Sequence, residues 1–271
     1  MQKKHKIPQK PIRVLEAPGL LDDYYLNLVQ WSKTNLISVG LDNSVYFYNF
    51  LNNKVTKHFD LNDIYSDLYF DNDFEFSPYV CSLSFNDNGK NMAISDSNGQ
   101  IFLTDVQTNQ VLSNEVVNSH RIGSLHWQEN MLICGSRDKL IRLFDVRQKF
   151  CKPLYSFAGH EQEICGLKFS PDNKYIASGG NDNQLLVWDI RKMQLLGELG
   201  EHNAAIKALA WNPRKKNILV SGAGTSDRHL RVFDVSTATQ LSKVDTGSQV
   251  CNVTFDSEGE KLLSTHGYSL N

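Results

Sequence analysis

The sequence predicts an all-β protein, a ring of small sheets built from a unit that repeats about every 40 residues. Five segments share a polar turn, then alternating apolar residues, then a close rich in aromatic and acidic residues: LDNSVYFYNF (41–50), SNGQIFLTDV (97–106), RDKLIRLFDV (137–146), NDNQLLVWDI (181–190) and SDRHLRVFDV (226–235). Three intervals between them, 40, 44 and 45 residues, match the length of a four-stranded propeller blade, and the remaining interval is 56. No stretch keeps an apolar period of 3.6 residues, so helices are not expected to matter.

The clearest unit shows how the strands are recognised. ICGLKFSPDNKYIASGGNDNQLLVWDI alternates three apolar runs with turns at Pro171–Asn173 and Gly180–Asn183, and AIKALAWNPRKKNILVSGAGTSDRHLRVFDV repeats the order. Each such sheet has two apolar faces that it cannot bury alone, and radial stacking against neighbouring sheets supplies the missing contact. We therefore expect a propeller domain over 13–271, preceded by a basic lead-in over 1–12.

The longest interval contains FDLNDIYSDLYFDNDFEFS (59–77), which carries six acidic and no basic side chains. A calcium loop needs a glycine at its sharp turn and a glutamate at fixed spacing, and neither is present. The sequence predicts a solvated acidic insertion between the first two blades, with a basic partner as the alternative.

Composition excludes several classes of protein. The 271 residues hold 28 Lys+Arg against 30 Asp+Glu, and 41% are hydrophobic, which is typical of a globular domain and not of a basic nucleic-acid coat or a disordered tail. No apolar run approaches the ~18 residues of a membrane span, and no secretory signal is evident. The five cysteines form no CxxC pair, and no phosphate-binding loop or metal-spaced His/Cys cluster is present, so we expect no metal and no cofactor. From the balanced charge and the lack of a membrane span, we expect neither nucleic acid nor membrane as a partner.

Recurring polar residues accompany the strands. One unit contains His160, Ser178, Asp182 and Trp188, and the next contains His202, Ser221, Asp227 and Phe233. Gly159-His160 and Trp188-Asp189 are the two dipeptides of the WD signature, so the chain resembles a WD-repeat propeller. A histidine, a serine and an aspartate also suit nucleophilic catalysis, but a hydrolase needs one such set and no G-x-S-x-G elbow is present. A structural hydrogen-bond network is the preferred interpretation, so no catalytic residue and no enzyme are expected.

Longer motifs point to one family of propellers. IPQKPIRVLEAPGLLDDYYLNLVQWS (7–32), VGLDNSVYFY (39–48), SGGNDNQLLVWD (178–189), GAGTSDRHLRVFDV (222–235), GSQVCNVTF (247–255) and LLSTHGYSLN (262–271) resemble the Fizzy/Fizzy-related family, the WD-repeat substrate receptors that activate the anaphase-promoting complex. The start IPQKP is somewhat closer to the Fizzy-related branch. The resemblance implies a non-catalytic protein of the cytoplasm and nucleus whose partners are core subunits of this ubiquitin ligase and substrates bearing short degrons.

The resemblance also implies where degrons bind. The positions that would read a KEN box fall on Asp23, Asn181, Asn183, Thr225 and Gln249. A carboxylate can accept hydrogen bonds from a lysine ammonium, and amides and a hydroxyl can bond the peptide's asparagine and glutamate. The alternative is that asparagines in such turns merely tolerate left-handed backbone geometry and cap their own turn.

For the destruction box, the resemblance assigns Glu16 as partner of the ligand's arginine and Leu15 to the apolar pocket for its leucine. The family commonly has aspartate where this chain has Glu16, so the carboxylate is kept but is carried by a longer side chain. The alternative is that both residues only lead into the first strand.

The sequence departs from the family at its end. It stops at Asn271, before the close of a sixth unit, so we expect an incomplete propeller of the seven-bladed type, with five full blades and part of a sixth. Two motifs that dock family members on the ligase, the C-box and the Ile-Arg tail, are not found. A generic WD-repeat interaction scaffold, without ligase-activating function, is therefore the competing interpretation.

Overall fold

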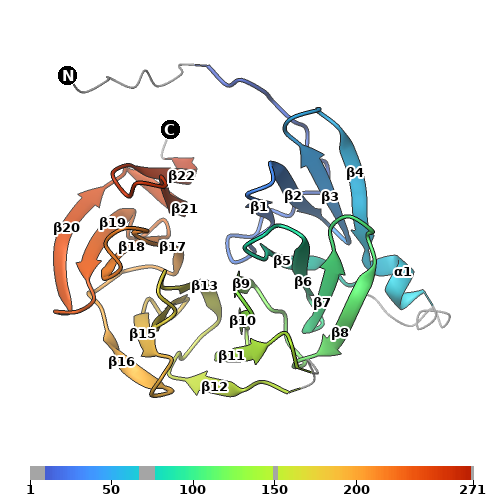
Figure 1. The fold of residues 1–271 in the computed structure, drawn as a ribbon. Coiled ribbons are helices and arrows are strands. Elements are labelled where there is room, and N and C mark those ends of the chain that lie inside the picture. Colours follow the sequence, from blue (N-terminus) through green and yellow to red (C-terminus); the bar gives the residue numbers. More distant parts are fainter. Residues whose placement is uncertain (1–9, 67–76, 149–151, 270–271) are drawn as a thin grey trace.

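The protein folds as a series of antiparallel sheets arranged around a common centre. The computed structural model describes residues 10–66, 77–148 and 152–269, and Figure 1 shows the sheets following one another along an arc, with β1 and β22 at its two ends. In the described part of the chain, five sheets have four strands each and one has two, so the predicted five full blades and part of a sixth are confirmed. Within the described residues, no helix is both long enough and apolar enough to cross a membrane.

The strands of each sheet follow chain order. The first sheet contains β1 (Val29–Trp31), β2 (Leu36–Leu41), β3 (Ser44–Asn49) and β4 (Val55–Asp60). The second contains β5 (Val80–Phe85), β6 (Asn91–Asp96), β7 (Gln100–Asp105) and β8 (Val111–Val116). The third contains β9 (Ser124–Gln128), β10 (Met131–Gly135), β11 (Leu140–Asp145) and β12 (Tyr155–Ala158). The fourth contains β13 (Ile164–Phe169), β14 (Tyr175–Gly180), β15 (Leu185–Asp189) and β16 (Gln194–Glu198). The fifth contains β17 (Ile206–Trp211), β18 (Ile218–Ala223), β19 (His229–Asp234) and β20 (Thr239–Asp245), and the sixth contains β21 (Ser248–Phe255) and β22 (Leu262–Ser269).

The fourth sheet shows why these residues form strands between two neighbours. Alternate side chains of β15 point to opposite faces, so Leu186 and Trp188 join the apolar cluster with the third sheet while Leu185 and Val187 join the cluster with the fifth. Both faces are buried, which explains why the sequence of this strand is apolar at successive positions. The asparagine of its first turn, Asn173, has the positive φ of 56° expected at a left-handed turn position.

Consecutive sheets pack against each other through apolar clusters. Separate clusters join the first sheet to the second, the second to the third, and so on to the sixth. The second strands of the fourth and fifth sheets carry a glycine near their ends, where the next sheet approaches closely. A Cβ atom on Gly179 would lie 2.2 Å from the carbonyl oxygen of Ile206, and one on Gly222 would lie 2.5 Å from the Val250 side chain. The glycines therefore set how tightly the innermost strands pack.

The segment predicted as a solvated acidic loop over 59–77 is ordered where it begins. Phe59 and Asp60 are the last two residues of β4, and Leu61–Tyr65 form a short helix, α1. The Asp60 side chain caps this helix by accepting from the amide of Asn62. Leu61 and Tyr65 are buried in the cluster between the first two sheets, and the Tyr65 hydroxyl donates to Asp96 at 2.6 Å. The loop prediction is therefore wrong for 59–65, because apolar side chains anchor this stretch. The rest of the segment, 67–76, lies outside the described residues, as does most of the basic lead-in.

The polar residues of the fourth sheet form one chain of hydrogen bonds. The Trp188 indole donates to Ser178 Oγ at 2.8 Å, and Ser178 Oγ lies 2.7 Å from His160 Nε2. The other ring nitrogen of His160 lies 3.0 Å from Asp182 Oδ2. Burial alone would raise the pKa of Asp182, but the hydrogen bond and charge of His160 hold it below its usual range. Ser178 is fully buried and bonded on both sides, so its hydroxyl has no path to a substrate.

The fifth sheet carries the same network with one change. His202 lies 2.8 Å from Ser221 Oγ and 2.6 Å from Asp227, but Phe233 stands where the fourth sheet has tryptophan. A buried guanidinium, that of Arg231, bonds Asp227 instead, with Nη2 2.9 Å from Oδ1. Burial opposes the Asp227 charge, but His202 and Arg231 outweigh it and hold the pKa of Asp227 well below its usual range.

We expect this buried ion pair to matter far more than an exposed one. Arg231→Met leaves the Asp227 carboxylate buried without its guanidinium and is expected to lower the free energy of unfolding by about 3–5 kcal/mol. Arg214→Met, which breaks the exposed Arg214–Glu258 pair, is the matched control and should cost less than ~1 kcal/mol. Urea unfolding of both variants measures the difference. Equal losses in the two variants would contradict the role assigned to Arg231.

Acidification should destabilise the fold through three histidines. Burial lowers the pKa of His58, His126 and His202 below 6.5, so the native state keeps all three neutral at a pH where the unfolded chain protonates them. Stability is then lost as the pH falls below about 6.5, by up to ~1 kcal/mol for each histidine at about pH 5.5. Thermal melting between about pH 7.5 and pH 5.5 should show a falling Tm. His58→Asn should flatten this slope and the exposed His120→Asn should not, whereas a slope that His58→Asn leaves unchanged would refute the assignment.

Candidate functional site

One segment, residues 22–28, crosses the mouth of the ring and bonds to the starts of the innermost strands. The Tyr24 hydroxyl donates to the carbonyls of Ala205 and Val250 at 3.3 and 3.1 Å. The Asn27 amide donates to the carbonyls of Gly123 and Cys165 at 2.7 and 3.1 Å. The four carbonyl groups lie in, or directly before, the first strands of the third, fourth, fifth and sixth sheets. The segment therefore connects these four sheets at the centre of the ring.

Four of the residues predicted to bind a degron line a single pocket at this mouth. This amide pocket, with a volume of about 370 Å³, lies between the Tyr24 and Tyr25 rings and the loops that precede or follow the inner strands. Its polar walls are formed by the side chains of Asn181, Asn183, Asn203, Thr225, Ser226 and Gln249. All are uncharged donors and acceptors, so the pocket suits a ligand that carries amide and hydroxyl groups.

The two asparagines of the fourth sheet are held differently. The Asn181 side chain accepts from the Tyr25 hydroxyl at 2.8 Å and donates to Gln162 at 2.7 Å, so its orientation is fixed by other segments and not by its own turn. Asn183 has a φ of 66°, as the turn interpretation expects, and its amide group has no hydrogen bond to a described residue. Across the pocket, Thr225 Oγ1 lies 3.3 Å from Gln249 Oε1, a long bond that leaves the Gln249 amino group available.

Asp23 lies beside the amide pocket and does not line it. Its Oδ2 accepts from Arg121 Nη1 at 2.6 Å, and its Oδ1 accepts from the Tyr25 backbone amide at 2.8 Å. Arg121 also forms a two-pronged pair with Glu163, with distances of 2.7 and 2.8 Å. Asp23, Arg121 and Glu163 together form what we name the carboxylate cluster. Two carboxylates against one guanidinium leave a net negative charge, which attracts a cation to this edge of the pocket.

Burial and ion pairing shift the pKa values of Arg121 and of two neighbouring residues, Tyr25 and Lys207. Burial raises the pKa of the Tyr25 phenol, so its hydroxyl stays protonated and donates to Asn181. Burial would lower the pKa of Arg121, but its bonds to Glu163 and Asp23 outweigh this and raise it. Burial lowers the pKa of Lys207, whose ammonium donates to the Leu26 carbonyl at 2.5 Å beneath the Tyr24 ring. The Tyr25 hydroxyl and the Arg121 guanidinium therefore keep their protons across the neutral range.

Sequence reasoning missed the two tyrosines and the Arg121–Glu163 pair. Tyr24 and Tyr25 stand in the quoted motif DDYYLN, beside Asp23, and two adjacent aromatic residues that follow paired carboxylates were a usable signal. Arg121 offered none, because 98 residues separate it from Asp23 and only the packing of the second, third and fourth sheets brings them together.

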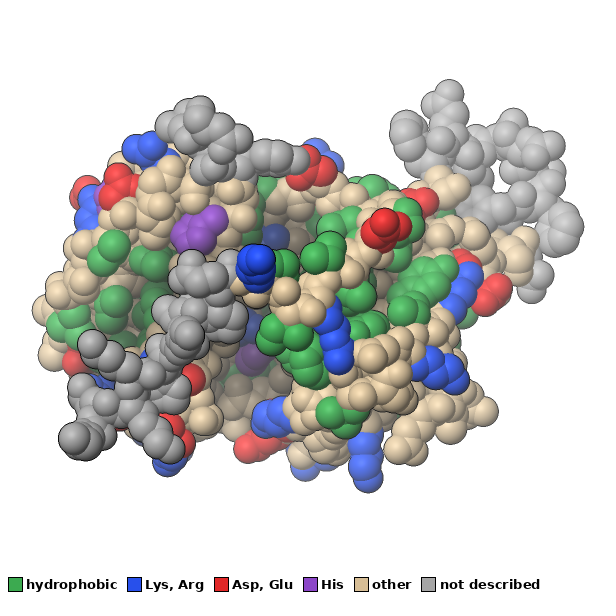
Figure 2. Space-filling model, turned by 90° about the horizontal axis from the view of Figure 1, so that it is seen from above, with side chains coloured by type: hydrophobic (Ala, Val, Ile, Leu, Met, Phe, Trp, Pro, Cys, Tyr) green, Lys and Arg blue, Asp and Glu red, His purple; other side chains and the backbone are tan. Residues whose placement is uncertain are grey.

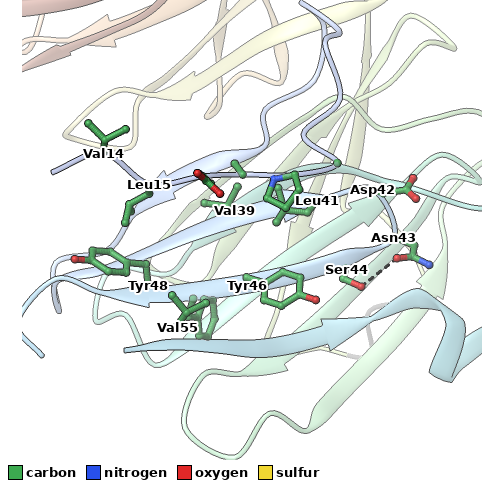
Figure 3. A pocket seen from close by; sticks show the side chains of 15 residues that line it. Val14, Leu15, Val39, Leu41, Asp42, Asn43, Ser44, Tyr46, Tyr48 and Val55 are labelled. Atoms are coloured by element: carbon green, nitrogen blue, oxygen red, sulfur yellow. Dashed lines mark hydrogen bonds between the residues drawn. The ribbon is translucent and has the colours of Figure 1, made fainter. Parts of the chain in front are cut away.

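Leu15 and Glu16 line a second, separate pocket on the outside of the first sheet. Its volume is about 790 Å³, and it lies between the segment 14–19 and strands β2 to β4. Figure 3 shows Leu15, Val39, Tyr46 and Tyr48 gathered over this sheet, and Figure 2 shows hydrophobic side chains collected on the same half of the molecule.

Arg13 fixes this segment over the sheet. Its guanidinium stacks 4.5 Å from the Phe50 ring and donates to the Phe50 carbonyl at 2.9 Å. The charged side chains that line the pocket are Glu16 and Asp42, so an apolar surface lies next to negative charge. That combination suits a peptide with one basic and one aliphatic side chain.

Comparison with known proteins places this architecture in one family. The family model described as CDC20/Fizzy WD40 domain matches residues 15–271. The chain is 42% identical over 268 residues to Protein FIZZY-RELATED 2 of Arabidopsis thaliana and 41% identical over 268 residues to the B-type cell cycle switch protein ccs52A of Medicago truncatula. These alignments cover 98% of this chain but 52% and 53% of the relatives. The chain thus spans about half the length of the curated relatives it matches.

A fission yeast relative and a solved structure agree with these matches. The Meiotic fizzy-related protein 1 of Schizosaccharomyces pombe is 35% identical over 268 residues, covering 99% of this chain and 60% of that protein. The structure described as Crystal Structure of Mitotic Checkpoint Complex contains a chain that matches with a TM-score of 0.86 and 33% identity, covering 99% of this chain and 81% of that one. The repeated sheets, the sequence motifs and these matches lead to one conclusion: the chain belongs to the CDC20/Fizzy family of WD40 propeller proteins.

Proposed function

We propose that this chain is a non-catalytic substrate-recognition subunit of the anaphase-promoting complex, acting in the cytoplasm and nucleus, and that it binds KEN-box and destruction-box degrons. Membership in the CDC20/Fizzy family and relatives named as cell cycle switch proteins support the role. The observation that carries it is geometric. Asn181, Asn183, Thr225 and Gln249, which are far apart in sequence, converge on one pocket at the mouth of the ring, with Asp23 at its edge.

The chemistry of this mouth fits a KEN peptide. The amide pocket offers unshared donors and acceptors on Asn183 and Gln249 for the peptide's asparagine and backbone. The net negative charge of the carboxylate cluster attracts the lysine ammonium. In the free protein Asp23 is bonded to Arg121, so the lysine would share the carboxylate with the guanidinium and would not meet an isolated charge.

A hydrolase is disfavoured by burial. The first histidine, serine and aspartate set, His160, Ser178 and Asp182, lies inside the fourth sheet with Ser178 fully buried and bonded to Trp188. An equivalent set recurs in the fifth sheet, as a structural network would.

A fluorescent KEN peptide tests the amide pocket. Asn181→Ala/Asn183→Ala removes two amide groups from the wall and should weaken binding by about 10- to 50-fold, at roughly 1 kcal/mol for each lost hydrogen bond. Fluorescence anisotropy measures the affinity, and thermal melting checks that the variant is folded. Asn52→Ala/Asn217→Ala, at two exposed positions outside the pocket, is the matched control and should bind as the wild type does. A wild-type chain that ignores the peptide would favour the scaffold interpretation over a degron receptor.

A destruction-box peptide tests the pocket on the first sheet. Glu16→Gln removes the charge opposite the peptide's arginine and should weaken binding by about 3- to 10-fold, most strongly at low salt. The same variant should bind a KEN peptide normally, because the two pockets share no residue. Glu260→Gln, exposed elsewhere on the surface, controls for the change in net charge. A second peptide carries alanine in place of the arginine, and its affinity should be the same for the wild type and for Glu16→Gln. If Glu16→Gln weakens the binding of both peptides equally, the assignment of Glu16 is wrong.

A further inference from the structure

A third pocket lies beside the amide pocket, toward the third sheet. It has a volume of about 540 Å³, and two residues, Tyr25 and Asn181, line both pockets. Its remaining wall is formed by Arg121, Arg137, Lys139 and the Glu161–Glu163 loop. Because the two pockets share walls, an extended peptide that occupies one can reach the other within a few residues, at ~3.3 Å for each residue.

Arg137 and Lys139 are two cations without an ion-pair partner among the residues that the structure describes. Both side chains are exposed. The carboxylate between them in sequence, Asp138, is already bonded to Arg142 at 2.6 Å. We name this pocket, with its two free cations, the cationic pocket.

The backbone that carries these cations is fixed. The amide of Arg137 donates to the Arg121 carbonyl at 3.1 Å, and the amide of Lys139 donates to the Ser136 carbonyl at 3.2 Å. Lys139 has a φ of 73°, a left-handed conformation that ends the turn between β10 and β11. The bond to the Arg121 carbonyl places the turn directly against the carboxylate cluster, so the two cations stand at a set position relative to the amide pocket.

The charges of the cationic pocket differ from those of its neighbour. Arg121 is matched by Glu163 and Asp23, so the charges left on the wall are Arg137, Lys139 and one carboxylate, that of Glu161. The Glu161 amide is anchored to Asp182 at 2.7 Å, which keeps this residue at the rim. The balance is one net positive charge, next to an amide pocket without charge and a carboxylate cluster with net negative charge.

We propose that the cationic pocket is a subsite for an anionic side chain, a carboxylate or a phosphoryl group, that flanks the degron held in the amide pocket. This inference rests on the proposed function and adds a substrate preference to it. Arginine and lysine together bind such groups through charge-assisted hydrogen bonds. A phosphoryl group carries nearly twice the charge of a carboxylate and three acceptor oxygens, so it should gain more from the same two cations.

A peptide series tests the subsite. One fluorescent KEN peptide has alanine on both flanks, and others carry glutamate or phosphoserine at successive flanking positions on one side or the other. At low salt, an anionic residue on one flank should tighten binding by about 3- to 10-fold, with phosphoserine above glutamate, and the gain should shrink as salt is added. Arg137→Ala/Lys139→Ala should abolish this gain and leave the affinity of the alanine-flanked peptide unchanged.

Two further variants sharpen the result. Glu161→Gln removes the remaining carboxylate and should enlarge the gain, whereas Arg191→Ala/Lys192→Ala, an exposed pair outside the pocket, should leave it as in the wild type. Binding of the alanine-flanked peptide with no gain from any anionic flank would overturn the subsite and leave the proposed function standing. Failure of the alanine-flanked peptide to bind at all would overturn the proposed function and the subsite with it.

Discussion

Burial of both faces of every small sheet is the constraint on which the rest of the structure depends. Successive positions along strands such as β15 are apolar, and their side chains serve two different clusters, one with each neighbouring sheet. A sheet of this kind is stable only between two others, so the sheets must follow one another around a centre. The glycines at the ends of β14 and β18 then allow the innermost strands to come close enough for this packing.

The mouth of the ring is a consequence of that stacking. The loops at one end of the inner strands are brought together, and their backbone carbonyls need partners once they are partly buried. Tyr24 and Asn27 supply four of these hydrogen bonds, and Lys207 returns one to the backbone of the same segment. The segment 22–28 therefore provides hydrogen-bond partners for backbone carbonyls at the centre of the ring. The same segment also forms part of the wall of the amide pocket.

Charge is distributed unevenly around this mouth. A buried ion pair holds the structure inside the fifth sheet, where Arg231 and His202 surround Asp227. Half-buried ion pairs do so at the carboxylate cluster, where Arg121 joins Asp23 to Glu163. Among the described residues that line the two pockets of the mouth, Arg137, Lys139 and Glu161 carry charges outside these pairs. The paired groups are buried or half-buried, whereas these three stand at the rims of the pockets.

The sequence by itself determined the fold, because a propeller blade is a local unit whose strands and turns are neighbours along the chain. The repeat interval and the turns at Pro171–Asn173 and Gly180–Asn183 located the strands of the fourth sheet, and the motifs identified the family. The local sequence pattern predicted a loop at 59–65, and this prediction was wrong. Leu61 and Tyr65 are buried because they pack into an apolar cluster that two sheets form together. Only the tertiary structure decided the candidate site: it separated Asp23 from the amide pocket and paired it with Arg121, and it placed Arg137 and Lys139 beside Asn181. The physical reason is that these contacts join loops of different blades, and the distances between them are set by how whole sheets pack and not by spacing along the chain.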